Sequence, residues 1–269
     1  MDIPGIDPFV WRFGSLGVRW YGLFMAISIA VGIWYLVRAG RQRHLSEDFL
    51  FNLSLVAVVG GILGARLVYV LTNLDFYLLH PAQIIRIDMG GLSFHGALLG
   101  GALAGWWYAA RNRVPLAPLL DLAVPGVATG IALVRIGNIF NREILGYPAV
   151  ILGGARHPAQ LYGSAIGVVL LLLFWRQTRQ DPPDGYRFWT AVIWYSILRF
   201  VNEFFRVQNP HFLIDYVNPY LGIGAVTLTQ WLTPLFLVVA WLYRRKALQA
   251  DRRWHAPKDS PVYEPPPKS

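Results

Sequence analysis

Long apolar runs separated by short polar segments make up most of this chain. A helix needs about 20 apolar residues to cross the hydrocarbon core of a membrane. Several runs approach that length, so the pattern predicts an all-α membrane protein, a bundle of about seven transmembrane helices. The fourth run is the weakest, but breaks such as Pro125 are tolerated inside a helical bundle. The predicted spans lie near residues 18–38, 49–71, 92–110, 117–134, 159–175, 188–206 and 221–243.

The basic residues predict how these spans are oriented. The clusters RAGRQRH, RNR, RQTRQ and YRRKALQADRR follow the first, third, fifth and seventh spans, so alternation places all four on one side. That side holds 15 of the 24 Lys and Arg residues. The positive-inside rule makes it cytoplasmic, with the N-terminus outside and the C-terminus inside. We expect a seven-span catalytic domain with short outer loops at residues 1–249, and a disordered Pro-rich cytoplasmic tail at residues 250–269.

Composition supports a membrane protein and narrows its chemistry. Only 14% of residues are charged, against about 25% in soluble proteins. The net charge of +9 comes in short clusters between apolar runs, which favours anionic membrane lipids over nucleic acid as partners. The chain has no cysteine, so it has no thiol nucleophile of its own. Its six histidines are scattered and no GxSxG motif occurs, so we expect no metal site, no cofactor and no serine nucleophile.

The outer side carries arginines but no lysine, which suggests a site for a phosphate group. A guanidinium binds phosphate oxygens in a bidentate manner; the alternative is that these side chains only extend to the membrane interface. On the sixth predicted span a polar stripe contains Glu203, which either offsets the burial of Arg199 or holds one arginine while another binds an anion. The outer arginines include Arg66, Arg135, Arg142, Arg156, Arg199 and Arg206, and the stripe comprises Tyr195, Arg199, Glu203 and Arg206.

Two further stretches are candidates for chemistry. His95 stands in GGLSFHG at the start of the third span, among residues small enough to let a ligand approach. An isolated histidine at a helix start can equally be structural. The segment RIGNIFNREILGYP follows the fourth span and is polar enough to leave the bilayer, so we expect it to be a membrane-surface loop.

Five motifs, in this order along the chain, resemble those of the bacterial prolipoprotein diacylglyceryl transferases: RWYG, GGLSFHG, RIGNIFNREILG, HPAQLY and YSILRFVNEFFR. The resemblance implies an enzyme of the bacterial plasma (inner) membrane with its active site toward the outer face. It would transfer the diacylglyceryl group of phosphatidylglycerol to the lipobox cysteine of a prolipoprotein, forming a thioether and releasing glycerol phosphate. The attacking thiol would then belong to the lipobox segment of the prolipoprotein signal peptide, which fits the absence of cysteine here.

Carried over to this sequence, the resemblance assigns catalytic roles to His95, Tyr195 and Arg199. His95 would take the thiol proton or orient the head group. The resemblance and the outer arginines, taken together, give eight expected substrate-binding residues: Arg135, Tyr21, Asn138, Glu143, Gly146, Glu203, Arg66 and Arg206. The chain departs from the family at Gly163, where a glutamate is common, at Arg142, where a small or different polar residue is usual, and at Thr229-Gln230, where the family has Gly-Gln. The loop between Gly146 and His157 is also short.

Two other classes were weighed on the residues. A transporter or lipid flippase predicts an internal repeat and charges near mid-membrane, whereas this chain shows no repeat at a fixed period and its charges lie toward the outer side. A non-catalytic scaffold does not require Arg, Asn, Glu and His at the ends of four different spans.

Overall fold

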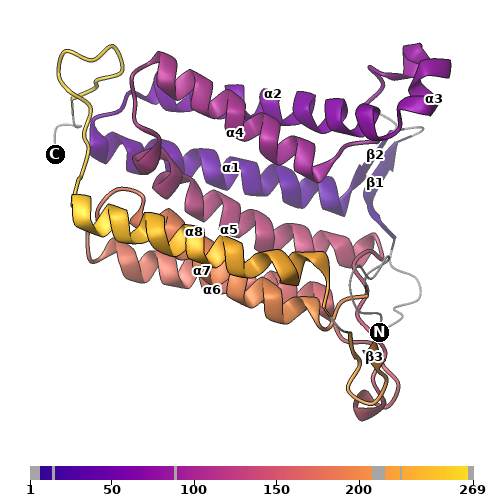
Figure 1. Ribbon diagram of the computed structural model, residues 1–269. Coiled ribbons are helices and arrows are strands. Elements are labelled where there is room, and N and C mark those ends of the chain that lie inside the picture. Colours follow the sequence, from indigo (N-terminus) through magenta and orange to yellow (C-terminus); the bar gives the residue numbers. More distant parts are fainter. Residues whose placement is uncertain (1–6, 14–15, 88–89, 208–215, 225, 266–269) are drawn as a thin grey trace. The chain divides into compact units, whose positions relative to one another are not determined.

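The computed structural model describes residues 7–13, 16–87, 90–207, 216–224 and 226–265. The chain divides into two compact units. The first comprises Met1–Tyr35 and Leu120–Arg253, and the second comprises Leu36–Leu119 and Trp254–Ser269. Both are built mainly from long helices (Figure 1).

The first unit holds most of the long helices and two short hairpins. An antiparallel pair of strands precedes α1, and a second pair lies between α7 and α8. The end of α1 and the start of α5 belong to the second unit. In chain order the elements are β1 (Phe9–Phe13), β2 (Leu16–Arg19), α1 (Trp20–Gly40), α5 (Leu116–Phe140), η3 (Val150–Leu152), α6 (Ala159–Thr178), α7 (Tyr186–Glu203), β3 (Val217–Asn218), β4 (Ile223–Gly224) and α8 (Leu228–Ala250).

The core of the first unit lies where α5, α6 and α7 meet. Ala128 of α5 packs with Ile166 and Leu170 of α6. In Figure 1, α7 lies beside α6 and α8. At the N-terminal end of α7, the buried carboxylate of Asp121 accepts hydrogen bonds from the backbone N–H groups of Gly185 (2.8 Å) and Phe188 (2.7 Å). These are N–H groups that a helix start leaves without intrahelical partners, so Asp121 fixes the beginning of α7 on α5.

The second unit is centred on one pair of helices that approach closely. Glycines line the contact between α2 and α4: a Cβ at Gly100 would lie 2.9 Å from the Cα of Gly64. Small residues at such positions let helix backbones approach, as is common in membrane proteins. Away from this contact α2 exposes large apolar side chains, among them Leu63, Leu67 and Leu71. The elements of this unit are η1 (Arg41–Arg43), α2 (Glu47–Thr72), α3 (Leu74–Leu79), η2 (Pro81–Gln83) and α4 (Phe94–Arg111).

The C-terminal segment differs from the disordered tail that its composition predicts. Residues 254–265 lie against the connection between α1 and α2. The N–H of Ser46 donates to the carbonyl of Val262 (2.8 Å), and the N–H of Glu264 donates to that of His44 (2.9 Å). Leu45 is fully buried and Val262 nearly so. The Pro-rich composition predicts disorder. Composition alone does not reveal that a few apolar residues and backbone groups find partners far away in the sequence.

Among the residues that the structure describes, four helical segments are long and apolar enough to cross a membrane: Trp20–Arg43, Glu47–Thr72, Leu116–Phe140 and Ala159–Thr178. The chain is therefore a mostly helical membrane protein. One expectation about its local structure is wrong: Arg135–Phe140 is not loop but the last turns of α5. Polar side chains do not by themselves end a helix, and Gly137 is accommodated because it packs on the backbone of Tyr21.

Candidate functional site

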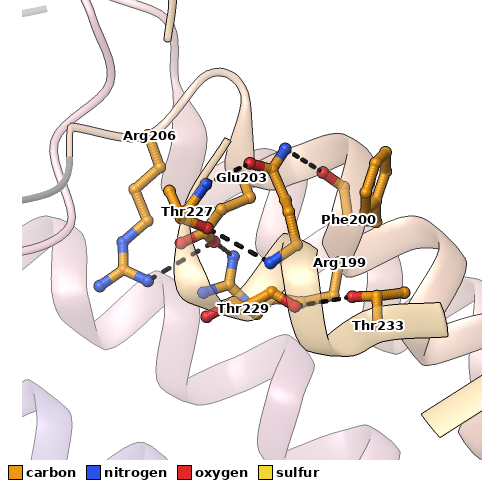
Figure 2. Close-up of polar contacts among 8 residues, drawn as sticks. Arg199, Phe200, Glu203, Arg206, Thr227, Thr229 and Thr233 are labelled. Atoms are coloured by element: carbon orange, nitrogen blue, oxygen red, sulfur yellow. Dashed lines mark hydrogen bonds and ion pairs between the residues drawn. The ribbon is translucent and has the colours of Figure 1, made fainter. Parts of the chain in front are cut away.

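The C-terminal half of α7 carries polar side chains that meet around one buried carboxylate. Tyr195, Arg199 and Glu203 follow at intervals of four residues, which places them on one face of the helix. The side chain of Glu203 is fully buried, and its Oε2 accepts a hydrogen bond from Arg199 (Figure 2). The hydroxyl of Tyr195 lies within hydrogen-bonding reach of Arg199. The face of α7 thus holds one guanidinium between a hydroxyl and a carboxylate.

A second arginine reaches the same carboxylate oxygen. Nη1 of Arg206 lies 3.9 Å from Oε2 of Glu203 (Figure 2). Arg206 does not continue the helical stripe, because α7 ends at Glu203. It is instead held by the backbone, through a bridge to Gly146. The carboxylate therefore links α7 to the segment that follows it.

Glu203 does not neutralise the arginines that surround it. Arg135, at the end of α5, is near enough to Arg199 and Arg206 for the three guanidinium groups to repel one another. No ion pair joins Arg135 to a carboxylate among the residues that the structure describes. The cluster therefore has a surplus of positive charge in a partly buried place, and such a surplus favours an anionic ligand.

The start of α8 supports α7 at this point, which the sequence analysis missed. Thr227 and Gln230 form a capping box, and Nε2 of Gln230 donates to the carbonyl of Phe200 (3.2 Å; Figure 2). Gln230 is almost completely buried. The signal was present, because a threonine followed three residues later by glutamine before an apolar run is typical of a helix start.

The end of α5 meets the start of α1 near Arg135. Tyr21 lies in the first turn of α1, where both Arg135 and Glu143 act electrostatically on its hydroxyl. Asn138 is buried near the end of α5, and its carbonyl accepts the N–H of Glu143 (3.0 Å). The end of α5 thus brings a guanidinium, a phenol and a carboxylate into one neighbourhood.

The turn after α5 has an unusual backbone. Arg142 and Ile144 have positive φ angles of 56° and 58°, and this conformation is costly for a branched residue such as isoleucine. The two residues flank Glu143, whose carbonyl accepts a hydrogen bond from Gln160 (2.8 Å). A left-handed backbone at residue 142 also explains why a small residue suits this position.

Gly146 lies at a crossing of backbone segments. A Cβ there would collide with the carbonyl of His157, so the close approach requires glycine. Nη1 of Arg156 donates to the carbonyl of Gly146 (3.0 Å). The N–H of Tyr147 donates to the carbonyl of Phe205 (3.0 Å). These contacts indicate that Gly146 shapes the loop that holds Arg206.

His157 organises this loop, a role that the sequence analysis did not assign. Its Nε2 lies 2.8 Å from the carbonyl of Leu221, so that nitrogen carries the proton. Its Nδ1 lies 3.2 Å from the hydroxyl of Tyr162, and its ring packs on Phe205. The motif HPAQLY gave the signal, because it places the histidine and tyrosine five residues apart at the start of α6.

The second unit holds His95 and Arg66. Ser93 caps the start of α4 by accepting the N–H of Gly96, and His95, in the first turn, is exposed. Arg66 instead donates four hydrogen bonds to backbone carbonyls and is 8% exposed. These contacts hold the segment before α4 in place. They join Nε to Ile84 (2.7 Å), Nη1 to Gly90 (3.0 Å) and Gly91 (2.9 Å), and Nη2 to Gln83 (2.5 Å).

The fold and the arginine cluster define a class: helical membrane proteins with clustered positive charge near helix ends. In the described part of the chain, no three metal-binding side chains gather. The profile of the family "Prolipoprotein diacylglyceryl transferase" matches residues 8–244. The chain belongs to this family.

Relatives named phosphatidylglycerol–prolipoprotein diacylglyceryl transferase match nearly the whole chain. The protein of Caldanaerobacter subterraneus subsp. tengcongensis is 44% identical over 257 residues, covering 95% of this chain and 100% of the relative. That of Thermus thermophilus is 38% identical, covering 90% of this chain and 99% of the relative. That of Pseudomonas aeruginosa is 37% identical, covering 93% and 98%.

Proposed function

We propose that this protein transfers the diacylglyceryl group of phosphatidylglycerol to the thiol of the lipobox cysteine of a prolipoprotein. Family membership and the names of the relatives support both substrates. The reaction forms a carbon–sulfur bond at the glyceryl carbon and breaks the bond from that carbon to the phosphate oxygen. The thiol proton is given up, and glycerol phosphate leaves. The substrate supplies the thiol, because the chain has no cysteine.

The observation that carries the proposal is the arginine cluster around Glu203. Arg199 and Arg206 share one buried carboxylate, and Arg135 adds a third guanidinium. Negative charge grows on the phosphate oxygen as it departs. Guanidinium groups already in place stabilise this charge, a contribution that is often the largest in enzyme catalysis.

The remaining residues of the first unit have supporting roles. Tyr195 orients Arg199 by hydrogen bonding. Tyr21, in the first turn of α1, and Asn138, near the end of α5, bind the head group together with Arg135, and Glu143 contacts its hydroxyl groups. Gly146 shapes the loop that presents Arg206.

His95 is the candidate proton acceptor. It is exposed at the start of α4 and is proposed to take the thiol proton, because an imidazole can act as a general base. Arg66 holds the loop before α4 in place and does not bind the head group, since four of its N–H groups already bind backbone carbonyls.

The protein is placed in the bacterial inner membrane with seven spans, the N-terminus outside and the C-terminus in the cytoplasm. Basic clusters after the first, third, fifth and seventh spans support this orientation. The active site then lies toward the outer face, where the arginine-rich helix ends collect.

The proposal is tested by incubating purified protein in vesicles of phosphatidylglycerol with a peptide that contains a lipobox cysteine. Mass spectrometry should show the diacylglyceryl adduct on the cysteine and not on a peptide with serine in its place. Arg199→Gln should lower turnover by about 100-fold or more, whereas the exposed Arg142→Gln should retain most of it. No adduct with the wild-type protein contradicts the function. Near-normal turnover by His95→Gln at saturating lipid contradicts its role as base.

A further inference from the structure

Arg135 runs directly across a glycine of α6. A Cβ added at Gly163 would lie 3.0 Å from Cδ, 3.1 Å from Cγ and 3.2 Å from Nε of Arg135. The place that a side chain at residue 163 would take is therefore already taken by the stem of the arginine. Gly163 is buried, so the arginine and not solvent fills this space.

Helices α5 and α6 are in close contact at this point. One residue after Gly163, the hydroxyl of Ser164 donates to the carbonyl of Ala132 on α5 (2.8 Å). One turn further on, a Cβ at Gly167 would lie 2.5 Å from the backbone N of Ala132. A larger residue at position 163 would therefore displace the side chain of Arg135 and leave the helices where they are.

Position 163 also affects the charge beside Arg135. Glycine supplies no carboxylate to Arg135, and the oxygen of Glu203 is shared between Arg199 and Arg206. We propose that Gly163 is a positioning residue that keeps Arg135 available and thereby makes the site prefer a phosphate group with two negative charges over one with a single charge. This inference rests on the proposed function.

The preference matches the change in charge during the reaction. The phosphodiester of phosphatidylglycerol carries one negative charge. When the bond to the glyceryl carbon breaks, its electrons remain on oxygen, so the departing glycerol phosphate is a monoester with two charges. A phosphate monoester has a second pKa of about 6 and stays doubly charged near neutral pH. Arg135 therefore favours the leaving group over the intact lipid head group.

The test compares two soluble probes and three variants. Glycerol phosphate is a doubly charged monoester, and glycerophosphoglycerol is a singly charged diester of the same parts. Binding of each to the detergent-purified full chain is measured by calorimetry. Gly163→Glu adds a carboxylate beside Arg135, Gly163→Gln adds the same bulk without charge, and Gly163→Ala adds only the Cβ. Thermal unfolding checks that each variant is folded.

The wild-type protein should bind glycerol phosphate more tightly than glycerophosphoglycerol. Gly163→Glu should lower this ratio by about tenfold relative to Gly163→Gln, since one added charge acts on one charge of difference between the probes. Equal ratios for the two variants, or no preference in the wild type, would overturn the inference. If Gly163→Glu does not fold, Arg135→Gln should lower the ratio, and an unchanged ratio would overturn it. Failure of the proposed function appears separately, as absence of the adduct with wild-type protein.

Discussion

Replacing Glu203 by glutamine should cost this protein both stability and activity. The change keeps the size of the side chain and removes its charge. In the native structure this charge is fully buried and lies between Arg199 and Arg206. With a neutral amide in its place, two guanidinium groups face each other in a partly buried environment.

The distance to Arg206 sets the scale of the effect. At 3.9 Å and an effective dielectric constant near 20, the attraction between two unit charges is about 4 kcal/mol. Breaking a buried pair by removing one partner typically costs about 3–5 kcal/mol, because the remaining charge is left uncompensated. Arg206 is partly exposed, so the lower end of this range, about 3 kcal/mol, is expected. For a chain of this size that corresponds to a fall in Tm of roughly 6–12 °C.

Thermal unfolding in detergent measures the loss, with Glu143→Gln as the matched control because Glu143 is exposed. The control should stay within about 2 °C of the wild type. The double variant Glu203→Gln with Arg206→Gln should recover part of the Tm, since it removes one of the two facing charges, while turnover stays low. A Tm unchanged by Glu203→Gln alone would refute the view that this carboxylate holds the cluster together.

Three further variants probe the surroundings of the site. Arg142→Gly should raise the free energy of unfolding in denaturant titrations by about 0.5–1 kcal/mol, because φ at this position is 56°; a loss of stability would contradict this account. Gly146→Ala should abolish turnover and lower Tm, because its Cβ would collide with the carbonyl of His157; normal turnover would show that the loop can move. Arg66→Lys should lower kcat in the transfer assay with little change in KM for phosphatidylglycerol, since Arg66 binds backbone carbonyls; a rise in KM alone would indicate contact with the head group.

The sequence was sufficient to predict a membrane protein and several of its long helices. The apolar runs locate α1, α2, α5 and α6, because a helix that crosses the hydrocarbon core needs about 20 apolar residues and such a run is visible in the sequence. The end of α5 was predicted poorly, since polar residues there signal a change of environment and not the end of a helix. The order of residues 254–265 could not be predicted, because it depends on contacts with residues 43–46, more than 200 positions away.

The site was predictable in part for a similar reason. The spacing of Tyr195, Arg199 and Glu203 predicts one helical face but leaves open which arginine Glu203 holds; in the structure Glu203 pairs with Arg199. The same periodicity places Arg206 on the face by continuing a helix that in fact ends. The use of Arg66 was hidden as well, because its partners are backbone carbonyls, which leave no trace in side-chain patterns.

The arrangement around Glu203 shows how one cluster can be stable and still bind an anion. If each arginine had its own carboxylate, the cluster would be stable and would leave no charge for a phosphate. If Glu203 were absent, the three guanidinium groups would repel one another without compensation. One buried carboxylate shared by Arg199 and Arg206, with Arg135 lying over a glycine, avoids both extremes. In the proposed reaction, the positive charge left over is available when negative charge develops on the departing phosphate, so stability and catalysis would depend on the same small number of charges.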